Sequence, residues 1–397
     1  MGEVKSMHME QIYEQIENSF SDLVEWRRYL HQNPELSFQE TETATFIAQK
    51  LRSFGLDVKE SIGGNGVIGI LTGEQEGKTI ALRADFDALP IQDEKETTYK
   101  SKKTGVMHAC GHDGHTSALL GVARTLSQFR EKIKGKLIFI FQHAEEKPPG
   151  GAKFMVEDGV LDGVDAVFGA HLATDIPYGK VAVGSGFRMA AVDAFTITIE
   201  GKGGHGARPH QSIDSIVIGS EIVQSLQKIV SRRINPLQAA VVTIGVFQAG
   251  DAFNVIANSA KLEGTVRTFD HDVRVQIEEE IRSIVKGITE AHHASYHIDY
   301  LNGYPSLYNH PSETELLREV LIELFSKESI VEFEPSMGAE DFAYFLQEKP
   351  GTYFKVGARN EHESTHFPHH HPRFDFEEKA LVIIGKAFVK IIEHYLF

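Results

Sequence analysis

Apolar residues follow a helical period near the start of the chain and form short, β-branched runs further along. The helical period is carried by five positions: Ile12, Ile16, Phe20, Leu23 and Leu30. It stops at Asn33-Pro34, and a second helix is predicted for residues 41–53. The apolar runs predict buried strands at 66–71, 79–84, 136–141 and 166–170, with a helix at 115–129. Strands separated by helices indicate a largely parallel sheet that is covered on both faces.

From about residue 191 the order of predicted elements changes to β-α-β-β-α-β. The elements are a strand at 193–200, a helix at 212–233, strands at 239–247 and 260–268, a helix at 272–292 and a strand at 296–301. This is the order of a ferredoxin-like α+β sandwich. After residue 309 the helices and a strand at 352–356 return to the first pattern. We therefore predict an α/β protein in which a discontinuous α/β/α domain, residues 1–188 and 303–397, is interrupted by an inserted ferredoxin-like domain, residues 189–302.

Composition excludes several classes of partner. The 397 residues are 41% hydrophobic, and no apolar run reaches the roughly 18 residues that a membrane helix needs. Lysine plus arginine total 40 against 56 aspartate plus glutamate, a formal charge of −16. Such a surface repels phosphate backbones and anionic lipids, so we expect neither a nucleic-acid nor a membrane partner. The first 21 residues are acidic and amphipathic, which is unlike a secretory or transit signal, and a cytoplasmic location is expected.

One eight-residue loop, His108 to His115, holds three histidines and the only cysteine, Cys110. Thiolate and imidazole donors together suit a borderline-soft divalent cation. A single cysteine has no internal disulfide partner, so Cys110 is a metal ligand, a nucleophile or an inert buried thiol.

Further donors follow the predicted strands. Asp85 and Asp87 come after the strand at 79–84, Glu145 and Glu146 after the strand at 136–141, and His171 after the strand at 166–170. Ligands of open α/β sheets bind outside the carboxyl ends of the strands. We therefore expect these segments and the histidine loop to form one site at one edge of the sheet.

The chemistry of hydrolysis explains the types of donor. A divalent ion lowers the pKa of its water from 15.7 to about 7, and a nearby carboxylate must then take up and deliver the proton. Neighbouring residues of an extended segment point in opposite directions, so one of Glu145 and Glu146 is free to bind metal while the other faces the water. With Cys110, His112, His171 and a C-terminal histidine, the donors exceed the three of a mononuclear catalytic zinc, which favours two ions.

Seven motifs then appear in order along the chain. They are Leu82-Arg83-Ala84-Asp85-Phe86-Asp87-Ala88-Leu89-Pro90, Met107-His108-Ala109-Cys110-Gly111-His112-Asp113, Gln142-His143-Ala144-Glu145-Glu146, Gly169-Ala170-His171-Leu172, Gly201-Lys202-Gly203-Gly204-His205-Gly206, Gly338-Ala339-Glu340-Asp341-Phe342 and His370-His371-Pro372. Together they resemble the amidohydrolase branch of the aminoacylase and carboxypeptidase superfamily of co-catalytic metallopeptidases. That branch includes hippurate hydrolases, N-acyl-L-amino acid amidohydrolases and indole-3-acetic-acid-amino-acid hydrolases. The resemblance runs from His31 to the C-terminal helix.

The resemblance implies a zinc-peptidase-like catalytic domain that holds two divalent ions, Zn, Mn, Co or Ni. Cys110 would bridge the ions, His112 and Glu146 would complete one site, and His171 and a C-terminal histidine the other. Glu145 would be the general base. On this reading His108 and His115 do not bind metal.

Two positions depart from the simplest pattern. Arg83 stands where the wider superfamily has a histidine ligand, and because arginine stays protonated it does not bind metal. Asp85 is therefore expected to orient a ligand rather than to bind an ion. Of His366, His369, His370 and His371, the branch's histidine-x-proline pattern selects His370. His143 replaces the proline that is usual in its motif, with an effect that the sequence leaves open.

The inserted domain contributes three further candidates. His205 corresponds to a histidine that resembles an oxyanion stabiliser reaching the active site of a partner subunit, which implies a homodimer or a dimer-based oligomer. Asn254 and Arg267 are candidates for binding the substrate carboxylate, since an arginine fork suits that group.

We therefore predict a metal-dependent amidohydrolase that cleaves the acyl–nitrogen bond of small N-acyl-L-amino acids. Benzoyl- or indole-acetyl-amino acid hydrolysis and metallo-carboxypeptidase activity are the alternatives within the family. A cysteine hydrolase, with Cys110 as nucleophile and His108 or His112 as base, would leave the strand-end carboxylates unused. A non-catalytic metal- or peptide-binding protein would not need Glu145.

Overall fold

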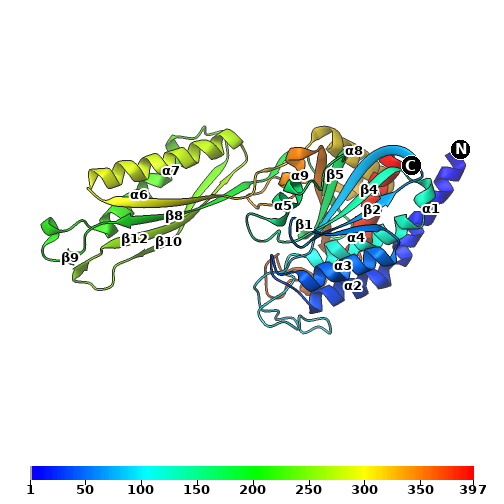
Figure 1. Ribbon diagram of the computed structural model, residues 1–397, viewed down its shortest axis with the longest axis horizontal. Helices are drawn as coiled ribbons and strands as arrows, with labels where there is room; N and C mark the ends of the chain where they lie inside the picture. Colours follow the sequence, from blue (N-terminus) through cyan, green and yellow to red (C-terminus); the bar gives the residue numbers. More distant parts are fainter. Residues whose placement is uncertain (1) are drawn as a thin grey trace. The chain divides into compact units, whose positions relative to one another are not determined.

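The computed structural model describes residues 2–397, with side chains from His8 onward. The chain divides into two compact units (Figure 1). Unit 1 comprises the chain up to Arg188, Tyr308–Glu334 and Asp341–Phe397, and unit 2 comprises Met189–Leu307 and Pro335–Glu340. The boundaries predicted at 188–189 and 302–303 stay a prediction, because a compact unit is not by itself a domain that folds independently.

Eight strands of the described chain form the sheet of unit 1. From edge to edge they are β1 (Asp57–Ile62), β2 (Gly66–Thr72), β4 (Lys134–Gln142), β3 (Gln75–Asp85), β5 (Ala166–Pro177), β16 (Gly351–Arg359), β6 (Val181–Val183) and β15 (Ile330–Glu332). The four central strands, β4, β3, β5 and β16, are parallel, and β1, β2 and β6 run antiparallel to a neighbour. The predicted α/β class with a largely parallel sheet is confirmed.

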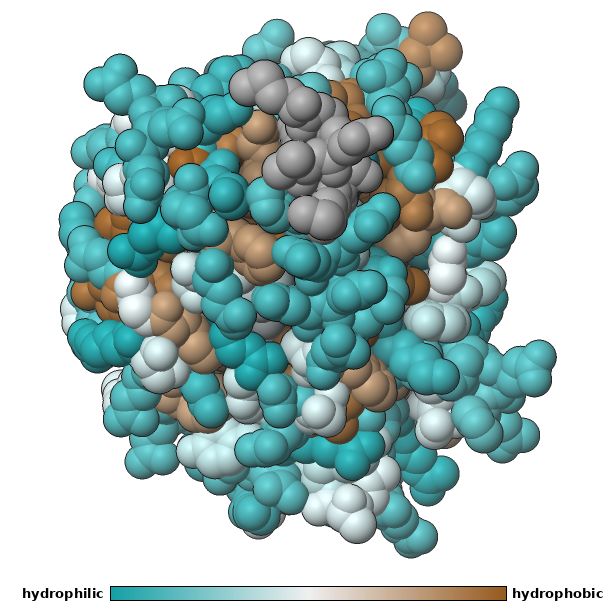
Figure 2. Space-filling model, turned by 90° about the vertical axis from the view of Figure 1, so that its right-hand side faces the viewer, coloured by the Kyte–Doolittle hydropathy of each residue, from teal (hydrophilic) through white to brown (hydrophobic). Residues whose placement is uncertain are grey.

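Helices bury this sheet. They are α1 (Gly2–Asn18), α2 (Phe20–Gln32), α3 (Thr41–Ser53), α4 (His112–Ser127), α5 (Gly151–Glu157), α8 (Pro311–Leu324), α9 (Ala343–Glu348) and α10 (Ala380–Leu396). Helix α4 packs against α2, α10 and β3, so it lies in the middle of the unit. Because α4 is almost completely buried, its first turn is held rigidly, and the histidine loop continues into this turn. The face of unit 1 in Figure 2 is mostly hydrophilic, with hydrophobic residues scattered among polar ones.

Unit 2 has the predicted β-α-β-β-α-β order. Its elements are β8 (Ala191–Glu200), α6 (Ser215–Arg232), β10 (Ala240–Ala249), β12 (Ser259–Thr268), α7 (His271–Ala291) and β13 (Ser295–Asn302). The strand order β10-β12-β8-β13 is antiparallel throughout and is that of a ferredoxin-like sandwich. Asp214 and Asp270 cap the two helices by accepting backbone N–H groups of the first turn. A two-stranded sheet, β9 (Gly204–His205) with β11 (Val255–Ile256), completes the unit.

Short strands connect the units. β7 (Gly186–Met189) pairs with β14 (Leu307–Asn309) where the chain leaves unit 1 and returns to it. Among the described helices, none combines the length and the apolarity that a bilayer crossing requires.

Candidate metal centre

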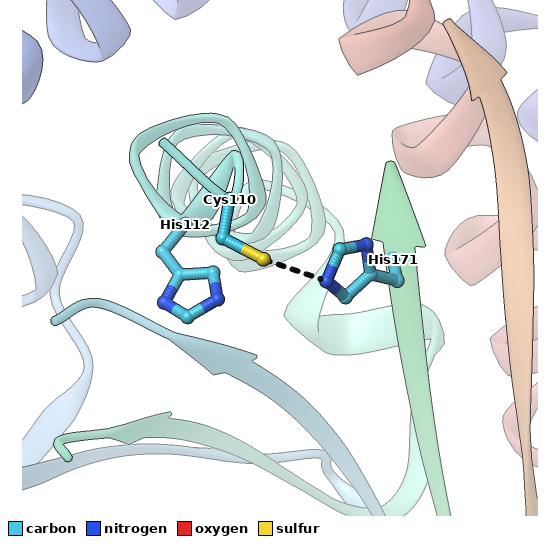
Figure 3. Close-up of side chains that lie close together, drawn as sticks. All are labelled: Cys110, His112 and His171. Carbon is cyan, nitrogen blue, oxygen red and sulfur yellow. Dashed lines mark hydrogen bonds between the residues drawn. The ribbon is translucent and has the colours of Figure 1, made fainter. Parts of the chain in front are cut away.

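The histidine loop runs directly into helix α4. The helix begins at His112, three residues earlier than predicted, because Gly111 adopts a φ of 93° and turns the chain into the first helical turn. This turn leaves Cys110 and His112 on either side of one glycine, facing a common space (Figure 3). The backbone conformation of Gly111 therefore sets the relative positions of the two donors.

His171 approaches Cys110 from the sheet. Its Nε2 lies 3.5 Å from the sulfur (Figure 3), while its Nδ1–H donates to the carbonyl of Leu172 at 2.5 Å. The second bond leaves the Nε2 lone pair directed at the space beside Cys110. His171 lies inside β5 rather than after it, because β5 continues to pair with β16 beyond its last contact with β3.

His112 is held in the same way. Its Nδ1–H faces the backbone carbonyl of Asp87 (3.0 Å) and the Asp87 carboxylate (3.1 Å), so in the neutral ring Nε2 carries the lone pair. That Nε2 is buried without a hydrogen-bond partner among the described residues. It lies 3.8 Å from Glu146 Oε1 and 3.9 Å from Glu145 Oε2, too far for hydrogen bonds. An ion about 2 Å from each ligand would fill such a gap.

The C-terminal loop supplies the last donor. His370 Nε2 lies 3.2 Å from Glu146 Oε1, and the His370 N–H donates to the Ala109 carbonyl at 2.7 Å. Cys110, Glu146 and His370 thus form a second group whose ligand atoms all lie within 4.8 Å of one another, as do those of Cys110, His112 and His171. These residues fit a pair of divalent ions that share Cys110.

The pairs of donors around Cys110 can be compared with the expected ones. The resemblance implied His112 with Glu146 and His171 with His370. Around Cys110 the structure brings His112 together with His171 and Glu146 together with His370, because His171 Nε2 points at the sulfur and the backbone bond of His370 to Ala109 holds its ring beside Glu146. His112 also lies within ligand range of Glu146, so the expected pairing of these two residues stays a prediction.

The neighbouring histidines of the C-terminal loop have other contacts. The His369 ring packs 5.1 Å from that of His171 and 4.8 Å from that of Phe374. His371 stacks on Phe367 at 4.5 Å, and His366 is hydrogen-bonded to the carbonyl of Asn360. Among the four candidates, His370 is the one grouped with Cys110 and Glu146.

The electrostatics of the centre favour cations. Burial raises the pKa of the Cys110 thiol well above its usual range, and Glu146 and Glu145 raise it further. A thiolate at this position therefore needs a positive charge beside it. Nucleophilic cysteines instead have a lowered pKa, so the cysteine-hydrolase alternative loses support. Burial lowers the pKa of His112, but Asp85, Asp87 and Glu146 outweigh that effect and raise it to about 10.

The supporting residues differ in part from those expected. Asp85 accepts from Arg83 (2.7 Å) and pairs with His115 Nδ1 (2.6 Å), and His115 Nε2 accepts from the Leu172 N–H (2.9 Å). His112 instead donates its hydrogen bond to Asp87, which the sequence placed at the strand end but gave no role. The sequence feature that could have indicated this role of Asp87 is its spacing: it follows Asp85 by two residues, and such residues lie on the same face of an extended segment.

The candidates of unit 2 lie at two separate places in that unit. Exposed His205 pairs with Val255 across β9 and β11, and the Asn254 carbonyl accepts from the Gly206 N–H at 2.8 Å, so His205 and Asn254 are close together. His205 and Asn254 both lie near the start of β12. Arg267 lies near the other end of β12, eight residues and about 26 Å along the strand. Unit 2 by itself therefore does not bring Arg267 to Asn254.

A mixed α/β sheet with thiol, imidazole and carboxylate donors at its carboxyl edge defines the class of metallohydrolases. Residues 81–394 match the model of peptidase family M20/M25/M40, and the chain belongs to this family. It is therefore a hydrolase of linear amides, as predicted.

Three comparisons describe its relatives. The chain is 51% identical over 377 residues, 95% of each protein, to the putative amidohydrolase YhaA of Bacillus subtilis. It is 49% identical to the N-acyl-L-amino acid amidohydrolase of Geobacillus stearothermophilus, over 77% of this chain and 82% of that protein. The crystal structure of YxeP of Bacillus subtilis, described as a dinuclear metal-binding peptidase of the M20 family, superimposes with a TM-score of 0.81 at 36% identity, over 95% of this chain and 98% of that one.

Proposed function

We propose that the protein is a two-metal amidohydrolase that cleaves the acyl–nitrogen bond of N-acyl-L-amino acids. The observation that carries the proposal is the convergence of five donors, Cys110, His112, Glu146, His171 and His370, on one space beside Glu145. The similarity to the N-acyl-L-amino acid amidohydrolase of Geobacillus stearothermophilus supports the substrate class.

Two groups of ligands would hold the ions. Cys110 is common to both, with His112 and His171 in one group and Glu146 and His370 in the other. Zn, Mn, Co or Ni bound there would polarise the scissile carbonyl and activate water near neutral pH. His112 donates from Nδ1 to the Asp87 carboxylate and His171 donates from Nδ1 to the Leu172 carbonyl, which fixes the rings in the orientation that ligation needs.

Glu145 is the proposed general base. It is 7% exposed and its Oε2 lies 3.9 Å from His112 Nε2, beside the proposed ions. From there its carboxylate takes a proton from the attacking water and returns it to the leaving nitrogen. This second transfer is required because an amine anion is a poor leaving group.

Unit 2 would bind the substrate and form a homodimer. Arg267 offers a guanidinium fork to the substrate carboxylate, and His205 donates to the oxygen on which charge develops. Asn254 lies beside His205, so it would bind the substrate from the same side as His205. Strand β10 is the edge of its sheet, with one side unpaired among the described residues, and exposed apolar side chains lie on it and nearby: Ile216, Val217, Val241, Phe247 and Phe253. An edge strand with apolar neighbours is a ready template for pairing with a second copy. Because His205 and Arg267 are far apart within one unit 2, His205 would act in the partner subunit's site.

A mixing experiment tests this arrangement. We expect His205→Ala to lower kcat by about 10²- to 10³-fold, since one oxyanion donor is lost. Mixing His205→Ala with Glu145→Gln subunits after dissociation should restore about a quarter of wild-type activity, because half of the dimers are mixed and each holds one complete site. The exposed neighbour His210→Ala is the control and should behave as wild type. Absence of recovery would show that His205 does not act across subunits.

A substrate panel tests the proposed reaction. The metal-loaded enzyme is assayed for amine release from N-acetyl-, N-benzoyl- and N-indoleacetyl-L-amino acids, N-acetyl-diaminopimelate and N-blocked dipeptides. We expect cleavage of N-acyl amino acids and little cleavage of the same compounds as carboxamides, because the carboxamide lacks the charge that Arg267 would bind. Turnover confined to the dipeptides would favour a carboxypeptidase and contradict the proposal.

The cytoplasmic location stays a prediction.

A further inference from the structure

A cluster of buried charges lies beside the donor groups without belonging to them. At its centre is Arg27 of helix α2, which is completely buried. Its guanidinium donates to Asp113 Oδ2 (3.0 Å), Asp375 Oδ1 (2.7 Å) and Glu378 Oε1 (3.0 Å). Asp113 comes from the start of α4, and the other two carboxylates come from the segment before α10. One side chain therefore joins two parts of the chain that are about 260 residues apart in sequence.

The first of these parts carries His112. Asp113 is the next residue, and its carboxylate accepts from the Gly114 N–H as well as from Arg27. His31, one turn further along α2, contributes a second bond to Asp113 through Nδ1 at 2.7 Å. Two residues of α2 thus fix the turn that presents Cys110 and His112.

The second part follows His370 by five residues. Asp375 accepts from the Tyr99 hydroxyl at 2.6 Å in addition to Arg27, and the Phe374 carbonyl accepts from Lys95 Nζ at 2.9 Å. The segment is therefore held at several points. On the side of the donors, a backbone bond from His370 to Ala109 links it to the histidine loop.

We propose that Arg27 is a positioning residue: by holding Asp113 and Asp375 together it fixes the distance between the His112–His171 group and the Glu146–His370 group. The inference rests on the metal centre proposed above. Lysine cannot replace arginine here, because its single ammonium lacks the planar fork that serves carboxylates in three directions. Without the fork the C-terminal loop relaxes, and the ion that depends on His370 is bound less well.

The experiment compares Arg27→Lys with Arg28→Lys in the full-length protein. Arg28 is the neighbour on the same helix and donates to Glu378 but not to Asp113 or Asp375. Each apoprotein is titrated with Zn²⁺ alone by calorimetry, and bound metal is counted after dialysis. We expect two ions in the wild type and in Arg28→Lys. In Arg27→Lys the affinity for one ion falls about 10- to 100-fold, as for other residues that orient ligands, while the other ion is retained.

Two further measurements separate positioning from simple destabilisation. Arg274→Lys weakens a largely buried ion pair with Asp193 in unit 2, and it should lower the melting temperature without changing metal affinity. In Co²⁺-loaded Arg27→Lys the cobalt–thiolate absorption should persist, because the ion bound by Cys110, His112 and His171 remains.

Each outcome decides one question. Two ions bound by Arg27→Lys at the affinity of Arg28→Lys would overturn the inference and leave the metal centre intact. A wild type that binds no ion would instead overturn the proposed function. If Arg27→Lys does not fold, Tyr99→Phe removes only the hydroxyl bond to Asp375 and should still weaken one ion by a smaller factor. Unchanged affinity in that variant would count equally against the inference.

Discussion

Glu145→Gln should retain both ions and lower kcat by about 10²- to 10⁴-fold, the range over which a positioned proton-transfer group accelerates a reaction. Glutamine has the size of glutamate and keeps the hydrogen-bonding capacity of the carbonyl oxygen, but it does not accept the proton of water. The donors that share Cys110 do not include Glu145, so its neutralisation should leave them in place. The measurement is kcat on the preferred substrate together with metal content by mass spectrometry.

The adjacent residue provides the matched control. Glu146→Gln makes the same change one position along, but Glu146 lies 3.2 Å from His370 and belongs to a group that shares Cys110. We expect this variant to lose one ion and activity together. Because Glu145 also lies within ligand range of His112, metal loss in Glu145→Gln would identify it as a ligand and reverse the assignment of the two glutamates.

Removal of metal should abolish turnover completely. Dialysis against EDTA or a phenanthroline is expected to give an inactive protein that Zn²⁺, Mn²⁺ or Co²⁺ reactivates, because only a bound ion activates water near neutral pH. The rate recovered with each metal, measured at equal occupancy, also shows which ion activates the enzyme most. The matched control is dialysis without chelator.

Alkylation distinguishes the metal mechanism from the cysteine alternative. With iodoacetamide, the metal-loaded enzyme should keep its activity, since Cys110 is buried and its thiolate is bound. The chelated protein should also resist modification and recover with metal, because a buried thiol whose pKa is raised is not a reactive thiolate. Rapid loss of activity in the loaded enzyme, with activity unaffected by chelation, would contradict the proposed function.

The helices and strands that matter most were predictable because their patterns are local. The predicted strands at 79–84, 136–141 and 166–170 lie within β3, β4 and β5, and the order of the inserted domain matches unit 2 element by element. β1 was missed: its residues Asp57–Ile62 are mostly exposed, so they carry no apolar run. The start of α4 was placed too late, since Gly111 in the left-handed region begins the helix ahead of its first apolar residue.

The sequence also determined which residue types are present and in which order, and this was enough to predict the class of enzyme and to name candidate donors. A metal ligand must offer a suitable atom, and the residue types that offer one can be read from the sequence. Here they are a thiol, imidazoles and carboxylates at strand ends, in the order of a known family. The family comparison confirms the class.

Only the tertiary structure decided which donors share a space. The rings of His112 and His171 are turned toward Cys110 by their hydrogen bonds to Asp87 and Leu172, and no spacing along the chain records such hydrogen bonds. The same holds for Arg27, which looks like an ordinary charge on an amphipathic helix until Asp113 and Asp375 are brought to it by packing. Local patterns specify elements, whereas the relative position of distant residues depends on how those elements pack.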